Sequence, residues 1–263
     1  MIGLFLGEKK LPIKILNKLK KNKIKYFIID LTNKNIFKKD KNSYFINIGK
    51  FGQILKLIKS KKCNKVIFAG NISKPKVSSL KLDLKGIYYM PRILKAFKLG
   101  DAAILKELIK ILLEHKIKVI KLNFFNPELT LSKGTYTKIK PDRFEKLDIK
   151  NGIDFLNKLN AHNHTQAIVL RKSKVIAQET SKGTQRMLQG VKKNKISQGM
   201  LIKFPKKKQD LRVDLPTIGL ETLKDCKRSG IKGIVLKSMK NIILDRNKCI
   251  TFANNNKMFI SVK

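Results

Sequence analysis

The chain has few cysteines, no tryptophan and no long apolar stretch. Cys63, Cys226 and Cys249 are odd in number and widely separated, without a CxxC pair, which excludes a disulfide framework and a zinc knuckle. A reducing compartment is therefore expected. No segment approaches ~18 uninterrupted apolar residues, and the N-terminal apolar run precedes its lysines, the reverse of the order in a signal peptide. The sequence predicts a cytoplasmic protein that touches a membrane at most peripherally.

Histidine is also scarce, and several familiar catalytic motifs are missing. His115, His162 and His164 form neither an HExxH motif nor the DxH and GNHD pattern of dinuclear metallophosphoesterases. The chain also lacks a GxSxG elbow, a GxGxxG fingerprint and a Walker A loop. Any catalysis is therefore expected to depend on carboxylates and basic side chains.

Acidic residues are few, with 18 against 60 basic residues and a formal net charge of +42. Such a charge suggests a polyanion as partner, either a nucleic acid or an anionic membrane. Only seven of the basic residues are arginine, however, and the lysines are spread through every segment, whereas bidentate phosphate or guanine recognition favours arginine. We therefore expect no dedicated nucleic-acid partner. A basic RNA- or ribosome-associated binding protein without catalytic activity is the alternative interpretation.

The first half of the chain alternates apolar, strand-like runs with helical patterns. This alternation predicts an α/β fold with a mostly parallel sheet covered by helices, in the Rossmann-like manner. The expected strands are Ile2–Leu6, Ile24–Leu31, Tyr44–Ile48, Val66–Ala69 and Ile117–Leu122. The expected helices are Leu11–Lys20, Phe51–Lys61, Pro91–Phe97 and Asp101–His115.

A second α/β domain is expected after a lysine-rich loop between Asn126 and Pro141. Turn-forming residues dominate this loop, so we predict domains at residues 1–130 and 131–263. The expected strands of the second domain are a hairpin over Gln166–Gln178, then Met200–Phe204, Leu211–Leu215 and Ile234–Lys237. The expected helices are Arg143–Leu159, Thr184–Lys192 and Glu221–Arg228.

The most informative segment for chemistry is QDLRVDLPT, residues 209–217. If Leu211–Leu215 is a strand, Asp210, Arg212 and Asp214 share one of its faces. Two carboxylates around an arginine can hold a divalent cation and a phosphate together. On these residues alone, an exposed row of ion pairs on an amphipathic strand is the simpler explanation.

Three loops offer weaker signals for ligand binding. Residues 3–12, GLFLGEKKLP, form a strand, a loop and a helix start, where backbone N–H groups can hold a phosphate. Residues 68–75, FAGNISKP, end a strand where open α/β sheets bind ligands. Asp101, after Gly100, is expected to cap a long helix and could also reach a ligand. Ordinary connecting turns and a helix cap are sufficient to explain all three, and for residues 3–12 a tight turn between strand and helix is the favoured explanation.

Short motifs occur in one order along nearly the whole chain. They are GLFLG with Leu11-Pro12, Ala69-Gly70 with Lys74-Pro75, the run Pro91 to Leu94, Gly100-Asp101, Gln166-Ala167, Glu179 with Gly183-Thr184, and QDxRxDLPTIG ending at Gly219. In this order they resemble the LpxI-type UDP-2,3-diacylglucosamine pyrophosphatases of lipid A synthesis. The last motif is highly specific to that family, and the others are moderately so.

The resemblance implies an N-terminal nucleotide-binding domain, a C-terminal catalytic domain and Mg²⁺ as cofactor. Water would attack the pyrophosphate of UDP-2,3-diacylglucosamine to release UMP and 2,3-diacylglucosamine 1-phosphate (lipid X). The enzyme would work in the cytoplasm against the inner membrane, and a homodimer is possible. The resemblance assigns Asp210 and Asp214 to metal binding and water activation, and Arg212 to the phosphate charge. It assigns substrate contacts to Gly7, Leu11, Pro12, Gly70, Asn71, Lys74, Pro75, Asp101, Gln166, Gly183, Thr184, Gln209 and Thr217.

The chain departs from the family pattern at several positions. Residues 8–10, Glu-Lys-Lys, stand where the family usually has a glycine-containing turn, and Gln185 stands where it has an acidic residue. Because Gln185 is not acidic, Asp210 and Asp214 would have to supply the carboxylates that the reaction needs. A non-catalytic module that binds a nucleotide sugar without a metal is a third interpretation.

Overall fold

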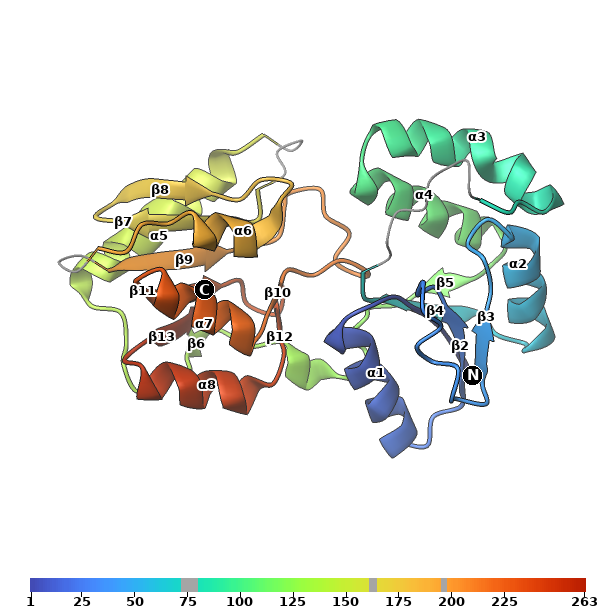
Figure 1. Cartoon of the computed structure of the whole chain (residues 1–263), viewed down its shortest axis with the longest axis horizontal. Coiled ribbons are helices and arrows are strands. Elements are labelled where there is room, and N and C mark those ends of the chain that lie inside the picture. The colour runs from blue at the N-terminus through green and yellow to red at the C-terminus, as the bar shows by residue number, and fades with distance from the viewer. Residues whose placement is uncertain (72–79, 161–164, 195–197) are drawn as a thin grey trace. The chain divides into compact units, whose positions relative to one another are not determined.

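The computed structural model divides the chain into two compact units (Figure 1). The first unit comprises Met1–Pro127 together with Arg212–Asp214. The second comprises Glu128–Leu211 and Leu215–Lys263. No helix in the described part of the chain combines the length and the apolar content of a membrane span. The structure describes residues 1–71, 80–160, 165–194 and 198–263.

The first unit is a five-stranded sheet with flanking helices. Its strands are β1 (Ile2–Leu6), β2 (Tyr26–Asp30), β3 (Ser43–Phe45), β4 (Lys65–Ala69) and β5 (Lys118–Val119). Its helices are α1 (Lys10–Lys21), α2 (Phe51–Ser60), α3 (Leu84–Lys98) and α4 (Asp101–Glu114). All neighbouring strands are parallel and their order is β3-β2-β1-β4-β5, which confirms the Rossmann-like prediction.

Both faces of this sheet are covered. Every residue of β1 is buried, as are four of the five in β2 and in β4, so these strands consist almost entirely of apolar residues. On one face, Phe5 and Phe27 join Ile54 and Ile58 of α2 in a hydrophobic core. Figure 1 shows α1 and α2 on opposite sides of the sheet. The sheet is therefore a rigid base for the loops at its ends.

Helix α3 differs from its predicted start, and helix α4 differs from its predicted N-cap. Helix α3 begins at Leu84, so Pro91 lies inside the helix and not at its start as predicted. Helix α4 begins at Asp101 as predicted, but its N-cap is Gly100, with φ of 98°. The prediction that Asp101 is the N-cap is thus wrong by one residue, because glycine adopts this positive φ without strain.

The second unit combines a six-stranded mixed sheet with a short two-stranded one. Its strands are β6 (Gly134–Thr135), β7 (Ala167–Arg171), β8 (Lys174–Gln178), β9 (Gly199–Lys203), β10 (Thr217–Ile218), β11 (Ile231–Leu236), β12 (Ile242–Ile243) and β13 (Phe259–Val262). Its helices are α5 (Arg143–Lys158), α6 (Gly183–Gln189), α7 (Leu220–Arg228) and α8 (Arg246–Asn255). The large sheet has the order β6-β13-β11-β9-β7-β8, and β10 pairs with β12. The predicted hairpin is confirmed as the antiparallel pair β7 and β8.

Two hydrophobic cores cover the faces of the large sheet in the second unit. Helices α6, α7 and α8 pack on the face that carries Val169, Leu201 and Ile234. Helix α5 packs on the opposite face, where Ile149 meets Ile202. Strand β9 is thus buried on both sides, and a polar side chain at its end lies in the interior of the unit.

Candidate functional site

The loops that follow β1 and β4 meet at the centre of the first sheet. These strands are adjacent and parallel, and the strand order runs outward from them in both directions. In open α/β sheets, ligands bind beyond the carboxyl ends of the strands at this point. The predicted residues Gly7 and Gly70 lie directly after the two strands.

The two loops contact each other closely. Glu8 N–H donates to the Asn71 carbonyl oxygen at 2.8 Å, and Gly7 N–H donates to the Ala69 carbonyl oxygen at 2.9 Å. A Cβ on Gly7 would lie 2.3 Å from the Asn71 carbonyl oxygen, so only glycine fits there. The N–H groups of Gly7 and Glu8 already have acceptors within the protein. A phosphate contact by this loop stays a prediction, and it would have to use other donors.

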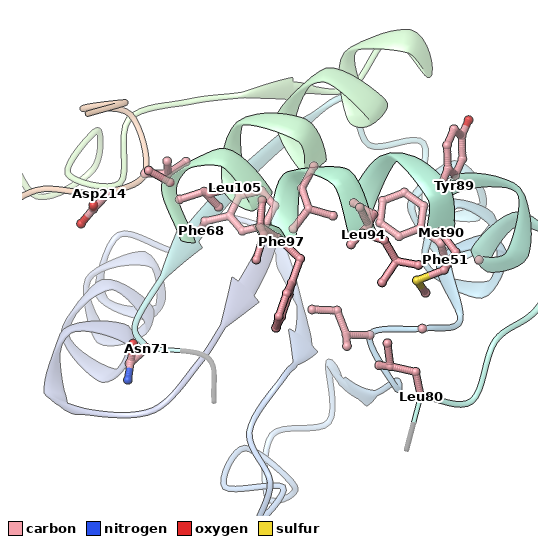
Figure 2. A pocket seen from close by; sticks show the side chains of 18 of the residues that line it. Phe51, Phe68, Asn71, Leu80, Tyr89, Met90, Leu94, Phe97, Leu105 and Asp214 are labelled. Carbon is pink, nitrogen blue, oxygen red and sulfur yellow. The ribbon is translucent and has the colours of Figure 1, made fainter. Parts of the chain in front are cut away.

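A pocket of about 370 Å³ lies in the first unit (Figure 2). Most of its lining is apolar and comes from the end of β4, the loop before α2, the helices α3 and α4, and the segment with Asp214. Figure 2 shows Asp214 and Asn71 at one end of the pocket and Phe51, Met90 and Leu80 at the other. Its volume lies in the range of sites for small molecules. An apolar chamber with polar groups at one end suits an amphipathic ligand.

An arginine joins the two helices that form the long wall of the pocket. Arg92 of α3 donates from Nε to Glu107 at 2.7 Å, and its two terminal nitrogens donate to Glu114 at 3.0 and 2.7 Å. Both carboxylates belong to α4. Hydrogen bonds from the Arg92 guanidinium hold the pKa of Glu114 below its usual value. The forked contact fixes α4 against α3 and so keeps the pocket wall in place.

One carboxylate caps two helices at the far end of the pocket. Asp83 is the N-cap of α3, and its Oδ1 accepts from Gly86 N–H at 2.8 Å. It also accepts from the first turn of α2, from Gly52 at 3.1 Å and Gln53 at 3.0 Å. Burial would raise the pKa of Asp83, but these three N–H donors outweigh it and leave the pKa below its usual value. Asp83 therefore holds the start of α3 against α2.

Replacing Asp83 by alanine is expected to destabilise the first unit by about 1–2 kcal/mol at neutral pH, because the N-termini of two helices lose their cap. The folded pKa of Asp83 is depressed, so its stabilisation is present above the pKa of the unfolded chain. It is lost as pH falls through the folded pKa. Urea denaturation of the wild type and of Asp83→Ala should show a stability difference at neutral pH that shrinks in acid. An equal difference at both pH values would contradict this role.

The predicted strand Leu211–Leu215 is wrong. Leu211–Val213 forms a turn, and β10 begins only at Thr217. Within this stretch Val213 and Leu215 are buried, whereas Arg212 and Asp214 are exposed. The alternation that suggested a strand is therefore real, but it has another cause.

That cause is the division of the segment between the two units. Val213 packs in the hydrophobic core of the first unit, and Leu122 N–H donates to the Arg212 carbonyl oxygen at 2.8 Å. Leu215 instead belongs to the second unit. Two buried residues that belong to two different units have the same spacing as one strand face. As a result Asp214 is fixed to the first unit, where it lines the pocket.

A buried ionic cluster lies in the second unit at the carboxyl end of β9. Lys203 and Glu179 are both buried, with nitrogen and oxygen 4.0 Å apart. Thr184 lies between them: Lys203 Nζ donates to its Oγ1 at 2.5 Å, and Thr184 donates to Glu179 Oε1 at 2.5 Å. Gln166 N–H donates to Glu179 Oε2 at 3.1 Å. The predicted contacts Gln166 and Thr184 thus share one charged cluster.

Two glutamines extend this cluster and leave one donor without an acceptor. Gln166 Nε2 donates to Gln209 Oε1 at 2.9 Å, and Lys206 N–H donates to the same oxygen at 2.9 Å. Gln209 Nε2 is buried without a hydrogen-bond partner among the residues that the structure describes. Such a donor costs about 1–3 kcal/mol unless an acceptor reaches it. Gln209 is therefore a position where an oxygen of a ligand would be stabilised.

The structure brings the predicted site residues into two groups and leaves a few apart. In the second unit, Gln166, Thr184 and Gln209 gather around Glu179, with Gly183 at the start of α6. Thr217 instead donates to the Leu215 carbonyl oxygen at the start of β10. Lys74 and Pro75 lie outside the described residues, as does the side chain of Asp101. In the first unit, Gly7 lies beside Asn71 and Pro12 beside Gly70, and Gly70, Asn71 and Asp214 line the pocket. Leu11 and Arg212 belong to the same unit but are not among the residues that line the pocket.

Sequence reasoning missed the ionic cluster and the pocket wall. Lys203 ends an apolar strand, and in a chain with so many lysines its position carried no signal. Glu179 was recognised only as part of a motif. The pocket residues Leu94, Phe97 and Leu105 have the spacing of ordinary core positions, so periodicity alone could not have identified them.

The predicted metal ligands are Asp210 and Asp214. Among the described residues, no three or more His, Cys, Asp or Glu side chains gather as a group that could hold a metal ion. Asp214 belongs to the first unit and Asp210 to the second. Mg²⁺ is usually held by one or two carboxylates together with water and substrate phosphates. A magnesium site at these two carboxylates therefore stays a prediction, and a single carboxylate such as Asp214 is sufficient for a Mg²⁺ ion that binds with a diphosphate.

Comparison with known proteins gives consistent matches across the chain. Residues 1–129 match the family described as the LpxI N-terminal domain, and residues 132–261 match the LpxI C-terminal domain. A protein of Caulobacter vibrioides named UDP-2,3-diacylglucosamine pyrophosphatase LpxI is 30% identical over 223 residues. That alignment covers 82% of this chain and 80% of the relative. The similarity therefore extends over both units.

Proposed function

Because this chain belongs to the LpxI family, we propose that it hydrolyses the pyrophosphate bond of UDP-2,3-diacylglucosamine in lipid A biosynthesis. The products would be UMP and 2,3-diacylglucosamine 1-phosphate (lipid X). One observation carries the proposal: an apolar pocket has Asp214 on its wall and Arg212 two residues away in the chain. A substrate with acyl chains and a diphosphate needs both kinds of surface.

The apolar part of the pocket is the proposed place for acyl chains. Its walls include Ile93, Leu94 and Phe97 of α3 and Leu105 and Leu108 of α4. Burying an apolar chain against such walls is favourable by about 0.8 kcal/mol for each methylene group. A nucleotide sugar without acyl chains would leave these walls in contact with water. The pocket therefore supports a lipid-linked substrate.

The polar end of the pocket would receive the diphosphate. In the reaction, a water oxygen bonds to one phosphorus while the bridging P–O bond breaks, and the water proton passes to a carboxylate. We assign the acceptance of this proton to Asp214 and the charge of the phosphate oxygens to the fork of Arg212. Mg²⁺ bound together with the diphosphate, with Asp214 as its ligand in the first unit, would neutralise phosphate charge and lower the pKa of water. The uridine is assigned to the loops at Gly7 and Gly70.

The second unit would contribute its ionic cluster. Lys203 and Thr184 lie at the carboxyl end of β9, and the buried amide N–H of Gln209 has no acceptor among the residues that the structure describes. A sugar hydroxyl or a carbonyl oxygen of the substrate would satisfy that donor. We propose that this cluster binds a polar group of a ligand within the second unit.

Purified protein is expected to release UMP from UDP-2,3-diacylglucosamine dispersed in detergent when Mg²⁺ is present. A chelator should abolish the release, because the phosphate charge would no longer be neutralised. UDP-glucosamine without acyl chains is the matched control substrate. It should be hydrolysed at least ~100-fold less efficiently, measured as kcat/KM, since it leaves the apolar pocket empty.

Each possible failure of this assay has a separate meaning. Absence of UMP with the diacyl substrate and Mg²⁺ would overturn the proposed function. Equal rates with and without chelator would remove the metal from the proposal. Equal kcat/KM for the acylated and the non-acylated substrate would show that the apolar pocket does not hold acyl chains.

A further inference from the structure

One face of α3 exposes apolar side chains to solvent. Leu84 and Tyr88, one helical turn apart, are 86% and 69% exposed, and Ile87 is exposed beside them. Pro91 and Leu94 continue the same face along the helix. We call these five residues the α3 surface. Helices of globular proteins normally place charged or polar residues on the side away from the core, so this arrangement indicates a partner.

The charges next to the α3 surface are basic. Leu84–Lys98 contains no acidic residue, and its exposed lysines are Lys85, Lys95 and Lys98. The Lys85 ammonium lies 5.7 Å from the centre of the Tyr88 ring. Apolar and aromatic side chains bordered by lysines are typical of helices that lie in the interface of an anionic membrane. Charge complementarity therefore selects an anionic lipid surface as the partner.

The α3 surface is continuous with the wall of the pocket. Leu94 belongs to both, because it is exposed and also lines the pocket. Met90 and Phe97, on the adjoining side of the helix, line the pocket as well. Figure 2 shows Leu94 and Phe97 along the middle of the pocket. An acyl chain leaving a bilayer under this helix would meet apolar side chains all the way into the pocket.

We propose that the α3 surface docks on a bilayer that contains anionic lipid, with Leu84 and Tyr88 inserted among the headgroups. The inference deepens the proposed function and rests on it, since it gives the lipid substrate a route from the membrane into the pocket. The lysines hold the protein at the charged surface, and the apolar side chains set the depth and orientation of docking.

Binding to vesicles tests the α3 surface independently of catalysis. The whole protein is sedimented with vesicles of phosphatidylglycerol and phosphatidylcholine, without substrate, and compared with Leu84→Ser/Tyr88→Ser. This variant keeps the net charge, so a loss of binding cannot be an effect of the general basicity of the chain. We expect binding to weaken about tenfold or more, because two inserted apolar side chains are lost.

A matched control comes from α5 in the second unit. Phe144 and Leu147 are 79% and 53% exposed, so Phe144→Ser/Leu147→Ser removes comparable apolar surface. This variant should bind vesicles like the wild type. Equal binding by the wild type and Leu84→Ser/Tyr88→Ser would overturn the proposal. The proposal would also be overturned if Leu84→Ser/Tyr88→Ser changed the oligomeric state of the protein but left vesicle binding unchanged. The α3 surface would then be an interface between copies of the chain.

Fluorescence of an attached dye can detect the contact between the α3 surface and the membrane while most of the surface is left unchanged. The three native cysteines are buried, so a polarity-sensitive thiol dye can be placed at Tyr88→Cys, with Phe144→Cys as control. Vesicles should shift the emission to the blue at position 88 only. An unshifted emission in protein that sediments with the vesicles would exclude docking through α3.

Hydrolysis in detergent separates this proposal from the proposed function. The Leu84→Ser/Tyr88→Ser variant should hydrolyse UDP-2,3-diacylglucosamine in micelles at the wild-type rate, because neither residue lines the pocket. In substrate-containing vesicles its rate should fall with its binding. If the wild type hydrolysed nothing in micelles but still docked through α3, the proposed function would fail and the membrane contact would stand.

Discussion

Asp214→Asn is expected to lower kcat by about 10²- to 10⁴-fold while leaving the fold intact. Asparagine has nearly the same shape as aspartate, but it cannot accept the proton of the attacking water and is a poor metal ligand. Asp214 is exposed on the pocket wall, so its replacement should change the free energy of unfolding by less than ~1 kcal/mol. UMP release under saturating substrate and urea denaturation are the two measurements.

Asp154→Asn is the matched control for this experiment. Asp154 is an exposed carboxylate on α5, so its replacement changes the net charge equally without touching the pocket. It should keep the wild-type kcat. If Asp214→Asn also kept its kcat, the assignment of the chemistry to this residue would be refuted, even though the family membership would stand.

Glu179→Gln is expected to destabilise the protein by about 3 kcal/mol, because it removes the nearby negative charge from the buried ammonium of Lys203. The double variant Glu179→Gln/Lys203→Met should recover part of that loss, since it removes the second charge as well. Chemical denaturation of the four proteins in the mutant cycle gives the coupling energy directly.

A surface ion pair provides the comparison. Glu221 and Lys224 lie 2.9 Å apart on α7, and both are exposed to solvent. Glu221→Gln should change stability by less than ~0.5 kcal/mol, because water already solvates both charges. Equal effects of Glu179→Gln and Glu221→Gln would show that the cluster in the second unit is not an electrostatic element of the interior.

Local sequence patterns predicted most of the first unit because its strands are buried on both faces. Ile2–Leu6 is an uninterrupted apolar run, and the structure forms β1 over these same residues. Helix α3 was harder to predict, since Pro91 is typical of a helix start. Its true start is set by the Asp83 cap, which contacts α2 some thirty residues earlier in the chain. Contacts between distant residues are not visible in local patterns.

The last part of the chain was not predicted at all. Helix α8 contains three asparagines and few large apolar residues, so it has only a weak amphipathic pattern. Strand β13 pairs with β11 and is the last parallel strand of the sheet. No local sequence feature predicts this pairing. Both elements depend on packing in the completed second unit.

The sequence drew attention to Arg212 and Asp214 but missed Lys203 and the apolar wall of the pocket. Asp214 and Arg212 stood out because carboxylates and arginines are rare in this chain. The pocket could not be predicted, since apolar positions facing a cavity have the same spacing as those facing a core. The prediction placed Asp210 and Asp214 on one face of a strand. It was wrong, because Leu211–Val213 forms a turn.

The assignment of Arg212–Asp214 to the first unit bears on where the chain can be divided. A gene cut at the boundary after Pro127 would encode a Rossmann-like half that lacks Val213 in its interior and Asp214 beside its cavity. In the remaining fragment, Val213 would have no hydrophobic core of the first unit to pack into. The first unit therefore depends on residues from far beyond Pro127, and we expect a fragment that ends at Pro127 to fold less stably than the whole chain.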